Sequence, residues 1–286
     1  MFTQLLAQHF VHTALWAGAV VAIVSGAIGV FVVARGMSFA VHAISELGFT
    51  GATGALALGL DPVLGILGGS VLVGLVLGLL SLRGRERDSA IGAVLAFGLG
   101  LGVLFLSLYE KQGYATEATS LLFGSIVGVS DTQLRNLVIV AAVVLAGLAV
   151  VYRPLLFSSV DPEIAAARGV PLRALSVAIF LLLALTTAEA IQVVGVLLVL
   201  TLVITPAAAA QRLTGRPTRA LLLSVGIALV STEGGILLSL AKPWPTSFFI
   251  ATISFAAYVG ARLVDWNRGR QKRLSSSPPR RVWAVR

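Results

Sequence analysis

Apolar runs long enough to cross a bilayer recur along almost the whole chain, and they restrict its possible folds more than any other feature. Cutting the sequence at charged and turn-forming residues leaves nine such runs: 11–34, 37–60, 63–82, 90–109, 134–152, 172–189, 191–210, 219–240 and 247–264. A helix of about 20 apolar residues crosses the hydrocarbon core once. The sequence therefore predicts an all-α integral membrane protein, a bundle of about nine transmembrane helices.

The composition excludes a soluble domain. Hydrophobic residues make up 57% of the 286 positions and charged residues only 12%, about half of the roughly 25% usual in soluble proteins. The surplus apolar surface must face lipid. The chain has no cysteine, which excludes disulfides, thiolate metal sites and cysteine nucleophiles.

The basic residues predict the topology. If the N-terminus is outside the cell, 18 of the 21 Lys and Arg fall in cytoplasmic segments, as the positive-inside rule requires. The expected location is a bacterial inner membrane, crossed many times, with the C-terminus in the cytoplasm. Because the basic residues lie between apolar runs and not on an aromatic-interleaved surface, the net charge of +9 does not indicate a nucleic-acid partner.

Two segments differ from the spans. Residues 1–264 are predicted to form the transmembrane domain, and residues 265–286, which contain Ser-Ser-Ser-Pro-Pro, a basic disordered cytoplasmic tail. The apolar segment 120–129 is too short to cross, so it is expected to be re-entrant, interfacial or packed into the bundle.

His42 and Glu46 are the most informative polar residues within the spans. They lie four residues apart, so a helix places them on one face within reach of each other. Imidazole and carboxylate together suit divalent first-row metals. Two interpretations stay open: a pair of metal ligands, or a hydrogen-bonded pair that fixes helix packing.

Two further carboxylates lie in or near the spans, where an ionised side chain is costly. Glu233 is followed by two glycines that let another backbone or an ion come close, and we favour a place on the transport pathway over a buried neutral acid. Glu189 is either a pathway residue or a solvated residue at the outer mouth. Gln192 is expected to hydrogen-bond backbone at a tight turn, and Pro206 to kink its helix.

The motifs of common enzymes are missing from the chain. There is no Gly-x-x-x-x-Gly-Lys-Ser/Thr loop, no His-Glu-x-x-His and no Gly-x-Ser-x-Gly. The chain is therefore not expected to hydrolyse ATP or to be an enzyme, and no permanently bound cofactor is expected.

A short amphipathic helix is predicted in the loop from Val160 to Pro171, which reads Val-Asp-Pro-Glu-Ile-Ala-Ala-Ala-Arg-Gly-Val-Pro. This loop resembles the coupling helix of importer permeases, a Glu-Ala-Ala stretch followed by Gly. Its Asp-Pro-Glu-x-Ala form is similar to the zinc, manganese and iron permeases of the ATP-binding-cassette class. The resemblance implies that Asp161, Glu163, Ala165 and Gly169 contact a partner ATPase.

Other stretches resemble the same family, and the match covers most of residues 15–265. They are Gln192 to Val199 with Pro206-Ala-Ala, Leu122 to Ser130, Gly234 to Ser239, and Pro243 to Pro245. This sequence differs from the family motif near the start of the second span, where the family typically has Gly-Asp-x-x-Ser-His. Here His42 stands for the Asp and Glu46 for the His, so both positions keep metal-ligand chemistry.

The resemblance implies the permease subunit of an importer for divalent zinc, manganese or iron. Its partners would be an ATP-binding cassette subunit, an extracellular or periplasmic metal-binding protein and a second copy of the chain. We expect His42, Glu46 and Glu233 to line the metal path. Two rivals stay open: a secondary transporter with a glutamate proton relay, and a membrane scaffold that transports nothing.

Overall fold

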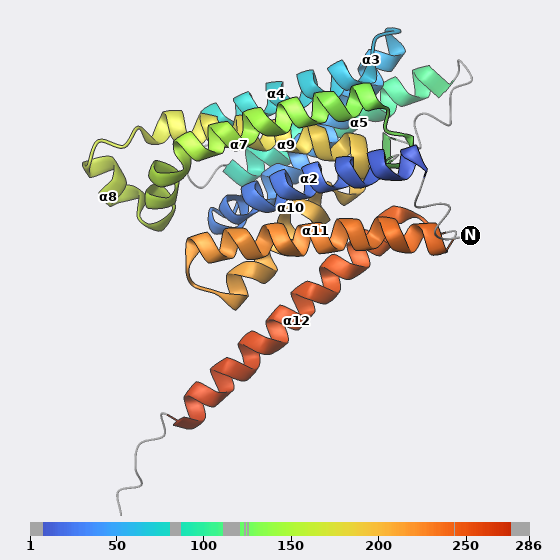
Figure 1. Cartoon of the computed structure of the whole chain (residues 1–286). Helices are drawn as coiled ribbons and strands as arrows, with labels where there is room; N and C mark the ends of the chain where they lie inside the picture. Colours follow the sequence, from blue (N-terminus) through green and yellow to red (C-terminus); the bar gives the residue numbers. More distant parts are fainter. Residues whose placement is uncertain are drawn as a thin grey trace, which may run out of the picture.

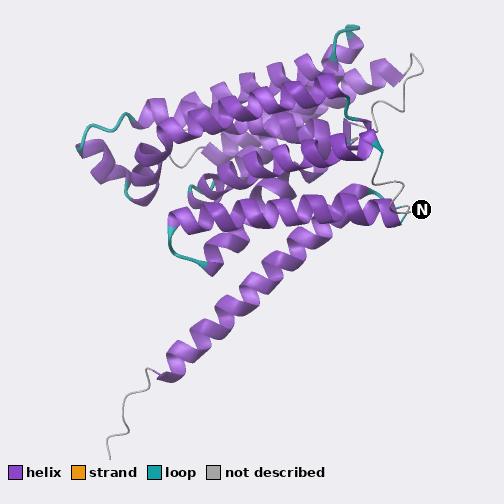
Figure 2. Ribbon diagram, in the orientation of Figure 1, coloured by secondary structure: helices purple, strands orange, loops and turns teal. Residues whose placement is uncertain are grey.

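The computed structural model describes residues 8–80, 87–110, 121–122, 124, 126–242 and 244–275. Within these ranges every regular element is a helix, and Figure 2 shows no strand there. The helices are α2 (His9–Ala34), α3 (Ser38–Ala57), α4 (Pro62–Leu80), α5 (Arg87–Glu110), the 3₁₀ helix η2 (Ile126–Gly128), α7 (Asp131–Val160), α8 (Pro162–Ala167), α9 (Leu172–Val194), α10 (Val196–Leu213), α11 (Pro217–Ala241) and α12 (Thr246–Ser275). This confirms the predicted all-α membrane fold.

Eight of the described helices are long and apolar enough to cross a membrane. The ninth expected span, α3, has 20 residues but does not reach the same hydropathy. Its sequence carries His42 and Glu46 together with several serines, threonines and glycines, which lower its apolar content. The helix least suited to lipid is therefore the one that holds the predicted metal ligands.

The centre of the bundle is formed by α2 and α9, which are the most enclosed of the eight apolar helices. The most exposed of them is α5, which packs chiefly on α3 at the periphery. Large apolar side chains such as Leu64, Leu72 and Phe97 face outward from α4 and α5, as expected for helices that contact lipid.

Small residues set the distance between α3 and α4, which run side by side (Figure 1). A methyl group added at Gly51 would overlap the carbonyl oxygen of Gly65, and one at Gly65 would overlap that of Gly51. The four-residue glycine spacing thus has a direct role here, because two backbones touch where a side chain would stand.

The two ends of the bundle differ in charge. Figure 1 shows α8, the α10–α11 connection and the far part of α12 at one end, and the basic residues Arg168, Arg212 and Arg216 lie in these segments. We call this the α8 end. The α3–α4 turn and the start of α7 lie at the opposite end. This distribution agrees with the one used to predict the topology.

The last helix is longer than the sequence predicted. It runs through residues 265–275, which we expected to be disordered, and residues 276–286 lie outside the described part. Two contacts hold this extension against the α10 terminus: Arg212 lies 3.6 Å from Asp265, and Arg268 donates a hydrogen bond of 3.0 Å to the Leu213 carbonyl. The pattern of charged residues alone does not reveal these partners.

The short segment before α7 packs into the bundle, one of the three arrangements expected for it. Gly124 has φ +78° and meets backbone at the end of α9, where an added methyl would lie 2.5 Å from the Val194 carbonyl carbon. Beside it, Gly195 with φ +80° is the single residue between α9 and α10. Gly124 needs to be glycine because its φ is positive and because a side chain would overlap the backbone of α9. Gly195 needs to be glycine because its φ is positive.

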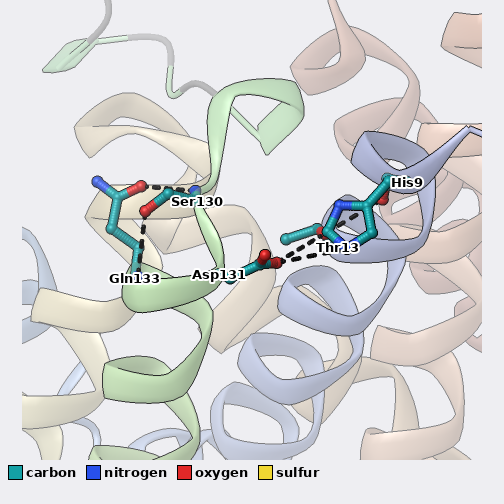
Figure 3. Close-up of polar contacts among 5 residues, drawn as sticks. All are labelled: His9, Thr13, Ser130, Asp131 and Gln133. Atoms are coloured by element: carbon teal, nitrogen blue, oxygen red, sulfur yellow. Dashed lines mark hydrogen bonds and ion pairs between the residues drawn. The ribbon is translucent and has the colours of Figure 1, made fainter.

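The start of α7 is capped and tied to α2, as Figure 3 shows. Ser130 and Gln133 form a reciprocal capping box, with N–H to oxygen distances of 3.2 and 2.9 Å. Asp131 lies 3.7 Å from His9 and accepts a hydrogen bond of 3.5 Å from Thr13. These contacts fix the two helices at the end opposite α8.

Candidate functional site

His42 and Glu46 lie one turn apart on α3 and are both half-buried. Within the described residues, the hydrogen bonds at these positions come from Ser45 to the His42 carbonyl (2.9 Å) and from Thr50 to the Glu46 carbonyl (3.0 Å). The structure therefore does not contain the hydrogen-bonded His–Glu pair that was the alternative. The hydrogen bonds at these positions thus involve the backbone and leave the imidazole and the carboxylate unbonded in the described structure.

Glu233 lies elsewhere, on α11 against α2. Its Oε1 atom is buried and lies 3.5 Å from where a methyl group would stand on Gly18. Nowhere in the described part of the chain do three His, Asp or Glu side chains gather into a group able to hold a metal. One chain therefore does not bring Glu233 into a shared ligand set with His42 and Glu46.

The predicted coupling helix is α8, six residues long, between α7 and α9. Asp161 caps it by accepting a 2.9 Å hydrogen bond from the Ile164 N–H, and Pro162 occupies the first turn, where its missing N–H costs nothing. Ala165 is fully buried, whereas Glu163 is exposed. One side of the helix thus packs on the bundle and the other is free for a partner.

Gly169 ends α8 by its backbone conformation. Its φ is +79°, and an added methyl group would meet nothing within 4 Å. The chain closes there through hydrogen bonds from Gly169 N–H to Ala166 (2.9 Å) and from Val170 N–H to Ala165 (3.0 Å), the pattern of a glycine helix stop. Gly169 therefore shapes the loop and is not needed for close packing.

One residue of this region escaped the sequence reasoning. Arg35, just past the end of α2, donates hydrogen bonds to Ser159 (2.9 Å) and Ser158 (2.5 Å), in the last turn of α7 before α8. More than 120 residues separate the partners, so no local pattern could pair them. Through this contact the end of α2 is joined to the last turn of α7, directly before α8.

Glu189 is not the solvated mouth residue that was one of its two interpretations. Only 1% of its surface is exposed, and its carboxyl group interacts with the backbone of Ala141 on α7 without a hydrogen bond of full geometry to either oxygen. Gln192 lies inside α9 and not at a turn, and its side-chain Nε2 donates a 3.1 Å hydrogen bond to the Ala188 carbonyl one helical turn earlier. Pro206 is buried inside α10, whose helix continues through it.

Comparisons with known proteins agree with this arrangement. Residues 7–265 match the model of the ABC 3 transport family. The chain is 34% identical over 239 residues to the "Manganese transport system membrane protein MntC" of Halalkalibacterium halodurans, covering 83% of this chain and 81% of that protein. It is 30% identical over 264 residues to the "Chelated iron transport system membrane protein YfeC" of Yersinia pestis, covering 90% and 88%.

A solved structure has the same fold. "PsaBC from Streptococcus pneumoniae in complex with Fab" superposes with a TM-score of 0.81 at 28% identity, covering 91% of this chain and 94% of that one. The match extends over nearly the whole of both chains. The chain belongs to the ABC 3 transport family and is the membrane permease subunit of an ATP-binding-cassette transporter, not itself an ATPase.

Proposed function

We propose that this permease imports a divalent first-row metal ion and that His42 and Glu46 bind the ion during passage. The observation that carries the proposal is the pair itself: an imidazole and a carboxylate, half-buried one turn apart on α3, with no side-chain hydrogen bond at either group in the described structure. Relatives named for manganese and for chelated iron favour these two metals over zinc.

The proposed path needs two copies of the chain. One copy supplies two ligands, whereas first-row divalent metals take four or more. Two copies related by a twofold axis would bring two His42 and two Glu46 together on that axis. A path must also release its ion, so a site shared between two mobile subunits suits transport better than a closed cage.

The partners follow from the two ends of the bundle. We propose that the ATPase binds at the α8 end, where Glu163 and Ile164 are exposed and Ala165 anchors the helix to the bundle. This end would be cytoplasmic, because the basic connections lie there. A metal-binding protein would deliver the ion to the opposite end, and the start of α2, which lies at that end beside the start of α7, would then be outside the cell. Glu233 stays a candidate for a separate position along the path.

Uptake of radiolabelled Mn²⁺ and Fe²⁺ into proteoliposomes tests this function. The vesicles hold the chain together with its ATPase, oriented with the ATPase inside. ATP is sealed inside the vesicles, and the metal-binding protein is added outside. We expect accumulation that requires ATP hydrolysis and exceeds the uptake of Zn²⁺. Metal accumulation driven by a proton gradient without the ATPase would favour the secondary transporter, and no accumulation of any of the three metals would contradict the proposal.

Asp161→Ala should uncouple the transporter while the bundle stays folded. The substitution removes the cap of α8 and destabilises that helix by about 1 kcal/mol, so the exposed surface for the ATPase is less often formed. We expect ATP-driven uptake to fall several-fold with an unchanged melting temperature. Asp161→Asn, which keeps a capping oxygen, should retain most of the uptake, and equal losses in the two variants would contradict a capping role.

A further inference from the structure

A cavity lined by aliphatic residues and a few polar ones lies at the end of the bundle opposite α8, away from the proposed metal pair. It has a volume of about 250 Å³ and opens between α4, α7 and α9. Four of its lining residues are polar: Asp61, Asn136, Glu189 and Gln192. The rest are the aliphatic residues Val63, Leu64, Leu67, Leu137, Ile139 and Val140.

Glu189 is the unusual member of this lining. Its relative exposure is 1%, and neither carboxyl oxygen makes a hydrogen bond of full geometry in the described structure; the backbone of Ala141 on α7 is the one group that interacts with the carboxyl. An unpaired buried carboxylate is costly, and buried charges in proteins are almost always paired or bound to a metal. The cavity beside Glu189 is the space where such a partner would stand.

The other polar residues supply oxygen atoms around the same space. Asp61 uses one oxygen, Oδ1, to cap α4 through the Val63 N–H at 2.8 Å, which leaves Oδ2 free of that contact. Gln192 donates its Nε2 to Ala188 at 3.1 Å, so its carbonyl oxygen is not used there. Asn136, on α7, adds a side-chain amide to the lining of the cavity. No histidine lines the cavity.

We propose that this cavity is a binding site for a hard divalent cation of the Mn²⁺ and Ca²⁺ type, anchored by Glu189 and completed by Asp61, Asn136, Gln192 and water. A donor set made only of carboxylate and amide oxygens suits these ions and disfavours zinc, which prefers nitrogen and sulfur ligands. The volume accommodates an ion that keeps several waters.

The site is separate from the proposed transport pair. His42 lies in the second turn of α3 from the α8 end, whereas Glu189 lies in the last two turns of α9 at the other end. A cation bound to Glu189 and Asp61 would join α9 to the α3–α4 turn at the end of the bundle opposite α8. The proposal stands whether or not the His42 and Glu46 pair carries the transported metal.

Counting bound Mn²⁺ tests the site without any transport. The chain is purified with its ATPase in lipid nanodiscs and carries His42→Ala and Glu46→Gln, so that the transport pair cannot bind metal. Titration with Mn²⁺ alone, followed by the electron paramagnetic resonance signal of the free ion, gives the number and affinity of bound ions. We expect one Mn²⁺ per chain, displaced by Ca²⁺ more readily than by equal Zn²⁺.

Glu189→Gln in that background should weaken this binding by at least about 100-fold, since even partners outside the first shell contribute about 10–100-fold to metal affinity. Asp61→Asn keeps the oxygen that caps α4 and should still weaken binding. The matched control is Asp131→Asn, an exposed carboxylate at the same end that pairs with His9 and Thr13 outside the cavity (Figure 3). It should bind Mn²⁺ like the background protein.

Three results would overturn the proposal: no bound Mn²⁺ in the background protein, undiminished binding in both Glu189→Gln and Asp61→Asn, or displacement by Zn²⁺ but not by Ca²⁺. Size-exclusion profiles and melting temperatures without metal show whether each variant is folded. If Glu189→Gln does not fold, Asp61→Asn alone decides, because Asp61 lies in an exposed turn.

Discussion

Replacing His42 by alanine together with Glu46 by glutamine should abolish ATP-driven metal uptake. These are the two side chains of α3 that we propose bind the ion, and within the described structure neither side chain has a hydrogen-bonding role that would explain a loss through misfolding. Because even second-shell changes reduce metal affinity about 10–100-fold, loss of both ligands should reduce uptake by more than about 100-fold. Initial rates in the proteoliposome assay measure this.

A rescue variant separates ligand chemistry from packing. His42→Asp with Glu46→His restores the order of ligands typical of the resembling permeases while changing the size of both side chains. If the two positions bind metal, this variant should keep substantial uptake. Its relative rates for Mn²⁺, Fe²⁺ and Zn²⁺ would then show how the order of the two ligand types affects metal selectivity. If the positions serve only packing, the exchanged pair should fail at least as badly as the Ala/Gln variant.

Gly51→Ala should cause the largest loss of stability of any single methyl addition in α3. The new methyl group would overlap the backbone oxygen of Gly65, and backbone cannot turn aside as a flexible side chain does. Overpacking in a well-packed interior costs about 1–3 kcal/mol, and this contact lies at the severe end of that range. We expect a clearly lower melting temperature in detergent and loss of the monodisperse peak in size exclusion.

Gly68→Ala is the matched control for this substitution. It lies on α4 within the same small-residue region, but a methyl group there would meet nothing within 4 Å. Alanine also favours a helix over glycine by about 0.5–1 kcal/mol, so this variant should be as stable as the parent protein or slightly more stable. Equal destabilisation by the two substitutions would contradict the close contact of α3 with α4.

The sequence predicted the helices well and their ends less well. The pattern at Arg153 and Pro154 suggested a stop near residue 152, yet α7 runs to Val160. Its last turn is held by Arg35 from α2, a contact that no local pattern contains. The polar residues Glu189 and Gln192 likewise suggested a turn near residue 190, whereas α9 continues to Val194 and breaks where Gly195 adopts φ +80°.

At the candidate site, too, the sequence predicted what depends on local spacing and missed what depends on contacts between distant segments. The i and i+4 spacing placed His42 and Glu46 on one helical face, because that spacing is a local property of the helix. It could not place Glu233, whose neighbours on α2 lie more than 200 residues earlier in the chain. Nor could it separate a mouth residue from a sealed one at Glu189, because burial depends on how α4 and α7 close over α9.

The single-residue joint at Gly195 limits how the bundle can move. Two helices linked by a long loop can slide past each other, but α9 and α10 are connected by one residue and share almost no slack. Gly124 also presses its backbone against this joint. A change in the angle between α9 and α10 would therefore be taken up by the backbone torsions at Gly195, because no longer connection is present to absorb it.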